Sequence, residues 1–472
     1  MEPLTWTGTL GGVLNPIFFT ATAVFLVAVL AQIVLSVVTG GAQAQGDMFV
    51  ATKGPADYAG MIVKWSFGVI VATILAYLIG GILVPGIEAK GIIGAISSRL
   101  LPVWIALVVV FAASIIFKRR LGLYGKLFDS PIGMIGFGMV MFWVFTGIFA
   151  AMDLIVTHDA LTQVSGMKNK VPGTPLSGAE GADYPYYLLG GDNLARDVFS
   201  RMIYGAWEVL KIAPFATIFA FMVGITLGLP AGYYGGKLDT FLSFLANLVL
   251  AFPVILLFYL LVTPEIVLTG IPIYMAGVLF LFPIIFLTIL FNSRFFTQPK
   301  KRNTYLAVTL VVGFWIYLGI AWDADPLGII SLPGNILVVF VSVVFVNSPT
   351  VFRIVRGLVL DIRTRDYVAA GQTRGEGPWY IMLWEILPNA RGPLIVDFCL
   401  RIGYTIILLG TLGFFGLGVS PESPDWGSTI NDGRRLLAIF PHPALAPAIA
   451  LMSLVLGLNL LADGLREESL KD

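Results

Sequence analysis

The stretch PLGIISLPGNILVVFVSVVFVNSPTVF, residues 326–352, contains no Asp, Glu, Lys or Arg. A helix crosses the hydrocarbon of a bilayer in about 20 residues, so this stretch predicts a membrane-spanning helix. Similar stretches recur along the chain and predict an all-α polytopic membrane protein with about 11 transmembrane helices. The candidate spans lie within residues 14–38, 65–87, 100–117, 130–152, 212–236, 240–264, 266–293, 303–322, 326–352, 394–418 and 436–462. The span at 394–418 is imperfect, because it contains Asp397 and Arg401, which are expected to pair at four-residue spacing.

The composition also indicates that the chain lies in a membrane. Of 472 residues, 57% are hydrophobic and 12% are charged. Water-soluble domains carry about 25% charged residues, so this chain has too little polar surface to cover a soluble core. Its net charge of +1 gives no reason to expect a nucleic-acid partner, and lipid is the expected surrounding. The single cysteine, Cys399, excludes an intramolecular disulfide.

The distribution of basic residues predicts the orientation, because cytoplasmic loops are enriched in Lys and Arg. Loops of one parity carry the basic residues, and the opposite loops are poorer in them or carry balancing acids. The basic residues are Lys118, Arg119, Arg120, Lys126, Lys237, Arg294, Lys300, Lys301, Arg302, Arg353, Arg356, Arg363, Arg365 and Arg374. The pattern predicts a multi-pass cell-membrane protein with its N-terminus outside and its C-terminus in the cytoplasm.

Two patterns before the sixth span concern helix packing. Residues 189–206, LGGDNLARDVFSRMIYGA, favour a short amphipathic helix over 192–205 on the external membrane face, capped by Asp192 or Asn193. A plain extension of the following span is the alternative. A row of glycines at four-residue spacing then allows close approach by another helix, either within this chain or from another subunit. The row consists of Gly224, Gly228, Gly232 and Gly236.

The segment 361–393, DIRTRDYVAAGQTRGEGPWYIMLWEILPNARGP, predicts two short helices on the cytoplasmic side. Gly375 and Gly377 separate them, and the second run, from Trp379 to Leu387, is expected to end near Pro388. The first helix carries a patch of small residues, and aromatic residues lie nearby. This composition favours a knob that docks into a groove of a cytosolic partner over a solvated connecting loop.

Signatures of catalysis and of ion coupling are absent from the sequence. There is no GxxxxGK[ST] phosphate-binding loop, and only two histidines are available for metal or nucleophile chemistry. We therefore expect that the chain is not an enzyme and that it does not itself bind a cofactor or a metal. The predicted spans hold few ionisable residues, which argues against a secondary, ion-coupled solute carrier. That carrier is kept as the alternative function.

The 361–393 segment resembles the EAA loop of ABC importer permeases of the dipeptide/oligopeptide/nickel class. The residues that match this coupling element are Asp366, Tyr367, Ala369, Ala370, Gly371, Gly375, Leu387 and Pro388. Other motifs resemble the same class: D-x-x-x-R-D-x-x-S-R-x-x-Y-G at 192–205, with Asp192, Arg196, Asp197, Arg201 and Tyr204; A-G-Y-Y-G-G-x-x-D at 231–239; A-F-P at 251–253; G-L-G-V-x-P at 416–421; D-W-G at 425–427; and D-G-L-R at 463–466. The sequence departs from the class at Ala369, where glutamate is usual, at Ala195, where glycine is frequent, and at Asn247, where aspartate is frequent.

The resemblance implies the core of a type I ABC importer permease with two extra-helix insertions. Residues 118–264 would form the first core part, with an external loop at 153–190, and residues 326–472 the second. Residues 1–117 would be an extension with three spans, and 265–325 an inserted two-span hairpin.

The resemblance also implies the chain's partners and cargo. They would be a second permease, two cytosolic ATPases that hold ATP and Mg, and an external solute-binding protein. Peptides are the commonest substrates of the class, and nickel, glutathione, opines and sugars are also carried.

Overall fold

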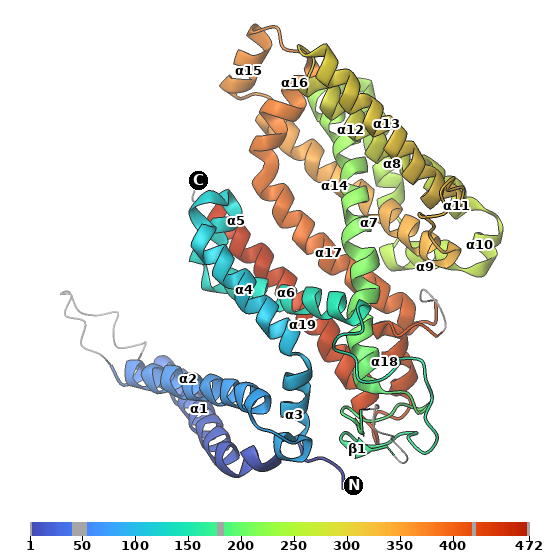
Figure 1. The fold of residues 1–472 in the computed structure, drawn as a ribbon. Coiled ribbons are helices and arrows are strands. Elements are labelled where there is room, and N and C mark those ends of the chain that lie inside the picture. Colours follow the sequence, from blue (N-terminus) through green and yellow to red (C-terminus); the bar gives the residue numbers. More distant parts are fainter. Residues whose placement is uncertain (1, 40–53, 177–183, 418–421, 470–472) are drawn as a thin grey trace. The chain divides into compact units, whose positions relative to one another are not determined.

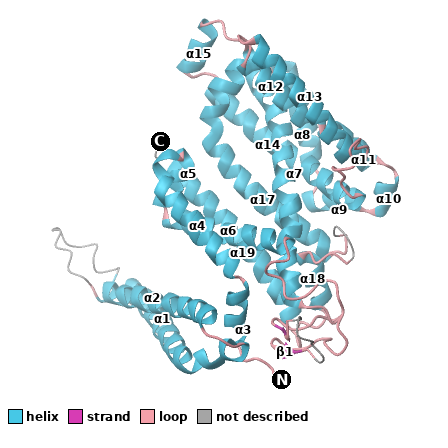
Figure 2. Cartoon of the chain, viewed as in Figure 1, coloured by secondary structure: helices cyan, strands magenta, loops and turns pink. Residues whose placement is uncertain are grey.

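The chain is described by a computed structural model that covers residues 2–39, 54–176, 184–417 and 422–469, and nearly all of its regular structure is helical (Figures 1 and 2). The helices are α1 (Gly11–Thr39), α2 (Pro55–Leu83), α3 (Ile87–Arg99), α4 (Leu101–Phe117), α5 (Gly122–Lys126), α6 (Pro131–Ala151), α7 (Val198–Tyr234), α8 (Gly236–Leu250), α9 (Val254–Val262), α10 (Pro264–Leu268), α11 (Ile271–Leu279), α12 (Leu281–Arg294), α13 (Pro299–Trp322), α14 (Gly334–Ile362), α15 (Asp366–Thr373), α16 (Pro378–Tyr380), α17 (Arg391–Phe414), α18 (Trp426–Arg434) and α19 (His442–Ser469). Shorter elements are the 3₁₀ turns η1 (Gly8–Leu10), η2 (Lys118–Arg120), η3 (Leu127–Asp129) and η5 (Leu387–Ala390), the π-helical turn η4 (Ile381–Ile386), and the antiparallel strands β1 (Thr174–Pro175) and β2 (Tyr186–Tyr187).

The predicted number of spans is confirmed. Over the described residues, ten single helices are long and apolar enough to cross a membrane, and α8 with α9 make an eleventh that bends by 80°. The bend falls at the A-F-P sequence, where Pro253 precedes α9. Proline has no N–H to continue a helix, which explains the break at this position. The imperfect span also forms: within α17, Arg401 Nη2 lies 2.9 Å from Asp397 Oδ1, as expected.

The chain divides into two compact units. One contains residues 1–104 and 155–199, so most of the predicted N-terminal extension, 1–117, shares a unit with most of the predicted external loop. In this unit α1 packs along α2, and the Tyr77 hydroxyl donates to Asn15 Oδ1 at 2.5 Å. The backbone N–H of Leu4 donates to the carbonyl of Gly173 at 2.9 Å, which joins the start of the chain to the loop.

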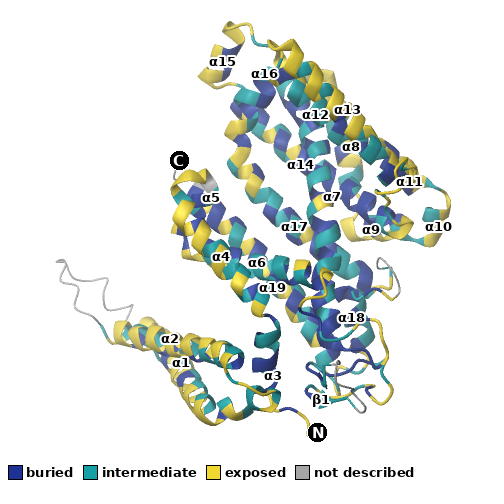
Figure 3. Cartoon of the chain, viewed as in Figure 1, coloured by how far each residue is buried: buried dark blue, intermediate teal, exposed yellow. Residues whose placement is uncertain are grey.

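The other unit contains residues 105–154 and 200–472. Helix α14 is its most buried span and is dark blue over most of its length in Figure 3. Its valines form the centre of an apolar cluster that also includes residues of α7 and α17, such as Ile212 and Leu412. Helix α19 packs along α6 and α17, as Figure 1 also shows for α6. Helix α14 is therefore the centre of one packed group of helices in this unit, and α19 lies in another with α6, α17 and α18.

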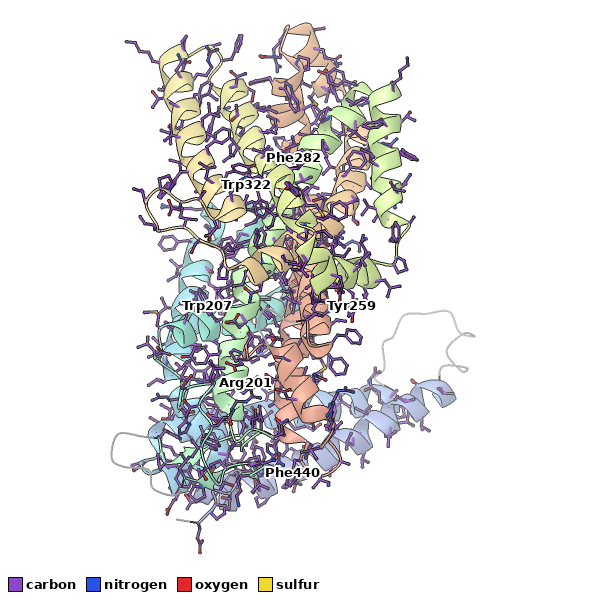
Figure 4. The ribbon with its side chains drawn as sticks, turned by 90° about the vertical axis from the view of Figure 1, so that its right-hand side faces the viewer. Arg201, Trp207, Tyr259, Phe282, Trp322 and Phe440 are labelled. Atoms are coloured by element: carbon purple, nitrogen blue, oxygen red, sulfur yellow. The ribbon has the colours of Figure 1, made fainter. Side chains whose placement is uncertain are left out.

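The segment 265–325, predicted to be an inserted hairpin, lies in this second unit and contains helices α11 to α13. The Tyr317 hydroxyl of α13 donates to the carbonyl of Gly277 in α11 at 2.9 Å. The Trp322 ring lies so close to Gly277 that a Cβ there would be 2.8 Å from it. Figure 4 labels Trp322 and Phe282 in this region. The hairpin is thus joined by contacts between its own helices, and it also packs on α14 through Ala276 and Phe280.

Candidate functional site

Helix α15 has one buried face and one exposed face. Val368 is fully buried and packs in an apolar cluster with Ile381 and Ile386 of the following turns. Gly371 faces the same turns, whereas Ala369 and Ala370 are exposed. An exposed pair of small side chains on a docked helix lets another surface approach the helix backbone closely. Asp366 and Tyr367 also lie exposed in the first turn, whose N–H groups favour an acidic residue such as Asp366.

The turn after α15 requires glycine at one position only. Gly375 has a φ of +76°, which side-chain-bearing residues rarely adopt. Gly377 has a φ of −67°, in the extended region, and a Cβ there would meet open space. An ion pair between Arg374 and Glu385, at 2.6 Å, joins the two sides of the turn. The predicted glycine turn is therefore present, and Gly375 is the residue that makes it.

The second helical run does not end near Pro388, so that prediction is wrong. Helical backbone continues from α16 through η4 and η5 into α17, and Leu387 and Pro388 are the first residues of η5. The π-helical turn η4 shifts the hydrogen-bond register just before the proline. A residue without an N–H is tolerated where a new helical turn begins, which explains why Pro388 does not break the run.

Polar contacts that sequence reasoning missed join this segment to the end of α7. The Arg363 guanidinium donates to the carbonyls of Gly232 and Tyr233, at 2.9 and 3.2 Å. The Gln372 amide donates to the Tyr233 hydroxyl at 3.2 Å, although its side chain is exposed. Carbonyls in the last turn of a helix have no intrahelical donor, and basic side chains nearby often donate to them. A basic residue close to a helix end was therefore the only feature of the sequence that could have predicted these contacts.

Three glycines of the four-residue row pack against α14 of the same chain. A Cβ at Gly224 would lie 2.5 Å from Val351, one at Gly228 2.9 Å from Val355, and one at Gly232 2.7 Å from Val359. The glycine row therefore packs within this chain, which was one of the two predicted alternatives. Gly236 does not belong to the row, because it starts α8 with a φ of +62° and faces open space.

The separate amphipathic helix over 192–205 is absent, so this prediction is also wrong. Helix α7 begins at Val198 and continues without interruption to Tyr234. This agrees with the alternative, in which the segment is a plain extension of the following span. Residues before Val198 form a turn, in which the Asp192 carboxylate accepts the N–H groups of Leu194 and Arg196. A carboxylate that binds the backbone of its own turn competes with helix formation, which explains the later start.

The polar residues of the 192–205 motif hold the loop and the start of α7 by buried contacts. Arg196 Nε donates to Asp192 Oδ2 at 2.7 Å, with both side chains almost fully buried. Asp197 accepts the N–H of Phe199 at 3.3 Å and the hydroxyl of Thr157 at 2.8 Å. Buried charges require partners of this kind, so these residues stabilise the fold.

The remaining motif residues lie further along α7. Arg201, labelled in Figure 4, is 1% exposed and donates to the carbonyl of Ser423 at 3.3 Å and the hydroxyl of Thr429 at 3.2 Å. The Tyr204 hydroxyl donates to the Asp153 carboxylate. These contacts make Arg201 and Tyr204 structural links between segments distant in sequence.

The D-W-G motif packs on the same part of α7. The Trp426 indole N–H donates to the carbonyl of Met202 at 2.8 Å, and the ring lies against Gly205. Asp425 caps α18 by accepting the N–H of Ser428 at 2.9 Å, and burial raises the pKa of its carboxyl. Two motifs separated by more than 200 residues thus meet. Residues 418–421 of the G-L-G-V-x-P motif lie outside the described residues.

The chain is similar to known transport permeases. Residues 224–467 match the family of binding-protein-dependent transport system inner membrane components. A glutathione transport system permease protein of Pectobacterium atrosepticum is 30% identical over 60% of this chain and 71% of its own length. Dipeptide transport system permease proteins of Alkalihalophilus pseudofirmus and Haemophilus influenzae are 26% and 29% identical, over 73% and 60% of this chain and 87% and 73% of theirs. The chain therefore belongs to this family and is a multi-pass, inner-membrane permease subunit of an ABC importer.

Proposed function

We propose that the permease imports short peptides and that the segment 366–388 couples it to two cytosolic ATPases. The single observation that supports the coupling role is the arrangement of α15. Val368 anchors the helix to the bundle, while Ala369 and Ala370 remain exposed beside the Gly375 turn. A helix anchored on one face can transmit a push on its other face to the spans it packs against.

The contacts behind α15 support a mechanical route into the bundle. Val368 shares an apolar cluster with Val355 and Val359 of α14, and the run after Gly375 continues directly into α17. Closure of the ATPases would therefore move α14 and α17 together. In the proposed mechanism these helices change the access of a path between this chain and a second permease from outward to inward.

The remaining assignments belong to the same proposal. The core consists of residues 118–264 and 326–472, the N-terminus is outside, and the C-terminus is cytoplasmic. An external solute-binding protein delivers the substrate. ATP and Mg are held by the ATPases, and this chain neither binds nor hydrolyses nucleotide. Peptides are proposed because the similar proteins are named for dipeptide and glutathione transport.

The experiment reconstitutes the chain with its second permease, ATPases and binding protein in vesicles. We expect uptake of a dipeptide only with ATP inside, and no micromolar nucleotide binding by the isolated chain. Ala370→Trp should lower ATPase co-purification and uptake, because a bulky ring would separate the surfaces, and Ala370→Ser should not. Uptake driven by a proton or sodium gradient without ATP would contradict the proposal. Competition by glutathione or Ni²⁺ rather than dipeptides would contradict the substrate assignment alone.

A further inference from the structure

The tip of the inserted hairpin, residues 294–302, is a cationic surface. Arg294, Lys300 and Lys301 are exposed, Arg302 is half-buried, and no Asp or Glu occurs between Glu265 and Asp323. On the adjoining segment, Glu385 already pairs with Arg374. Four positive charges in nine residues, without an acid in the hairpin, create a positive potential that attracts anionic groups.

The position of the tip places it at the level of lipid headgroups. It joins two candidate spans of 24 residues each, Ile271–Arg294 and Pro299–Trp322. A helix of that length rises about 36 Å, whereas the hydrocarbon layer is roughly 30 Å thick. Both spans are therefore long enough to cross the hydrocarbon and to leave their charged ends among the headgroups.

The hairpin carries exposed apolar side chains on α13 and at the tip. Val308 and Val311 of α13 are 55% and 71% exposed, and Phe296 at the tip is 67% exposed. The Arg302 guanidinium lies 5.8 Å from the centre of the Phe296 ring. Aromatic rings beside basic residues at the end of an apolar helix face are typical of a membrane interface. An acidic protein surface would satisfy the charges but would leave the apolar face without a role.

The tip also contacts the segment that follows the Gly375 turn. The Trp384 indole N–H donates to the Ser293 hydroxyl at 3.1 Å, and the Arg294 guanidinium lies 4.5 Å from the centre of the Trp384 ring. Phe286, Ile289 and Leu290 of α12 pack in the same apolar cluster as Trp384. The tip and the end of α12 are therefore in direct contact with the 378–390 run.

We propose that the hairpin tip binds anionic phospholipid headgroups and that this contact holds the 378–390 run in place for energy coupling. The lipid contact stands on the chain by itself, whereas its effect on coupling rests on the proposed function. Lys300, Lys301 and Arg302 bind phosphate oxygens, and Phe296 lies at the edge of the acyl region. Trp384 links the bound tip to the coupling segment.

The first experiment measures lipid binding in nanodiscs, where both membrane faces are accessible and chain orientation has no effect. The full chain is placed in discs of phosphatidylglycerol and phosphatidylcholine, extracted in mild detergent, and its retained lipids are measured by mass spectrometry. Each basic residue near an anionic surface contributes about fivefold. Lys300→Gln with Lys301→Gln and Arg302→Gln should lower the phosphatidylglycerol preference more than tenfold. Lys300→Arg with Lys301→Arg keeps the charge and should keep the preference. Equal retention by wild type and the triple variant would overturn the proposal.

The second experiment measures substrate-stimulated ATP turnover of the complete transporter in the same discs. We expect turnover to rise severalfold from pure phosphatidylcholine to discs with phosphatidylglycerol, and the triple variant to lose this rise. Trp384→Phe removes the hydrogen bond to Ser293, so it should retain phosphatidylglycerol but lose part of the rise. If the triple variant instead loses ATPase association in pure phosphatidylcholine, the tip is an ATPase contact and the lipid assignment is wrong. If wild type shows no ATP turnover in any disc while lipid preference persists, the proposed function fails and the lipid site stands.

Discussion

Asp239 and Arg356 form a two-pronged ion pair: Arg356 Nη2 lies 2.6 Å from Asp239 Oδ2, and its Nε donates to the other carboxylate oxygen. The pair joins the first turn of α8 to α14, 117 residues further along the chain. Asp239 ends the A-G-Y-Y-G-G-x-x-D motif, so the motif's last residue fixes the turn after α7 to the most buried span.

Removing this pair should lower stability. Asp239→Ala leaves the Arg356 guanidinium part-buried without its carboxylate, which costs about 1–3 kcal/mol in the free energy of unfolding. The measurement is thermal unfolding in detergent. Asp129→Ala is the control, because the Lys118–Asp129 pair is exposed and such pairs contribute about 0–1 kcal/mol. Equal losses of stability in the two variants would contradict a larger contribution from the Asp239–Arg356 pair.

Gly224 should tolerate no side chain, because the α7–α14 contact leaves no room for one. Gly224→Ala would place its methyl group 2.5 Å from Val351, and overpacking of this kind costs about 1–3 kcal/mol. Gly357→Ala is the matched control on α14, where a Cβ would meet open space. We expect a lower unfolding temperature for Gly224→Ala only. A Gly224→Ala protein with the unfolding temperature of the wild type would show that α7 and α14 can move apart without loss of stability.

Ala195 is strained, and glycine should relieve the strain. Its φ of +63° lies in the left-handed region, which costs alanine about 1–2 kcal/mol. Glycine adopts this conformation freely but loses more entropy on folding, so Ala195→Gly should gain about 0.5–1 kcal/mol. Ala23→Gly, on an exposed face of helix α1, should instead lose about 1 kcal/mol. Thermal unfolding of both variants measures the difference, and destabilisation by Ala195→Gly would contradict it.

Gly375 should be the most sensitive position for energy coupling. Gly375→Val forces a β-branched residue to a φ of +76°, at a cost of about 1–3 kcal/mol that shifts α15. We expect normal membrane insertion but reduced uptake and ATP turnover in the reconstituted transporter. Gly377→Ala is the control, since its φ is ordinary and its Cβ would meet no atom within 4 Å. Wild-type transport by Gly375→Val would exclude the 366–388 segment as the coupling element. Gln372→Ala is a poorer control, because Gln372 bonds Tyr233.

The hairpin tip should face the cytoplasm. After replacement of Cys399, Thr297→Cys would place a thiol on the exposed tip between Arg294 and Lys300. We expect an impermeant thiol reagent to modify it in opened vesicles but not in intact cells, because basic loops are retained on the cytoplasmic side. Ready modification in intact cells would show that the orientation of the whole chain is the opposite of the predicted one.

The sequence by itself determined the spans and the turn at Gly375. Long uncharged runs such as 326–352 favour helices in lipid, because a helix satisfies every backbone N–H and C=O within the segment, and α14 covers this run from Gly334 onward. The clustered glycines after α15 indicated a turn, because few other residues adopt a positive φ. These properties depend on local chemistry, which a sequence displays directly.

Only the tertiary structure decided which surfaces these elements cover. The glycine row could have packed on any helix, and it is α14 that approaches Gly224, Gly228 and Gly232. The start of α7 at Val198 and the continuation of the helix through Pro388 depended on competing hydrogen bonds, from the Asp192 carboxylate and from the π-helical turn η4. The Asp239–Arg356 and Trp384–Ser293 contacts join residues about 90 to 120 positions apart. Such contacts are set by how helices pack, and no spacing along the chain encodes that packing.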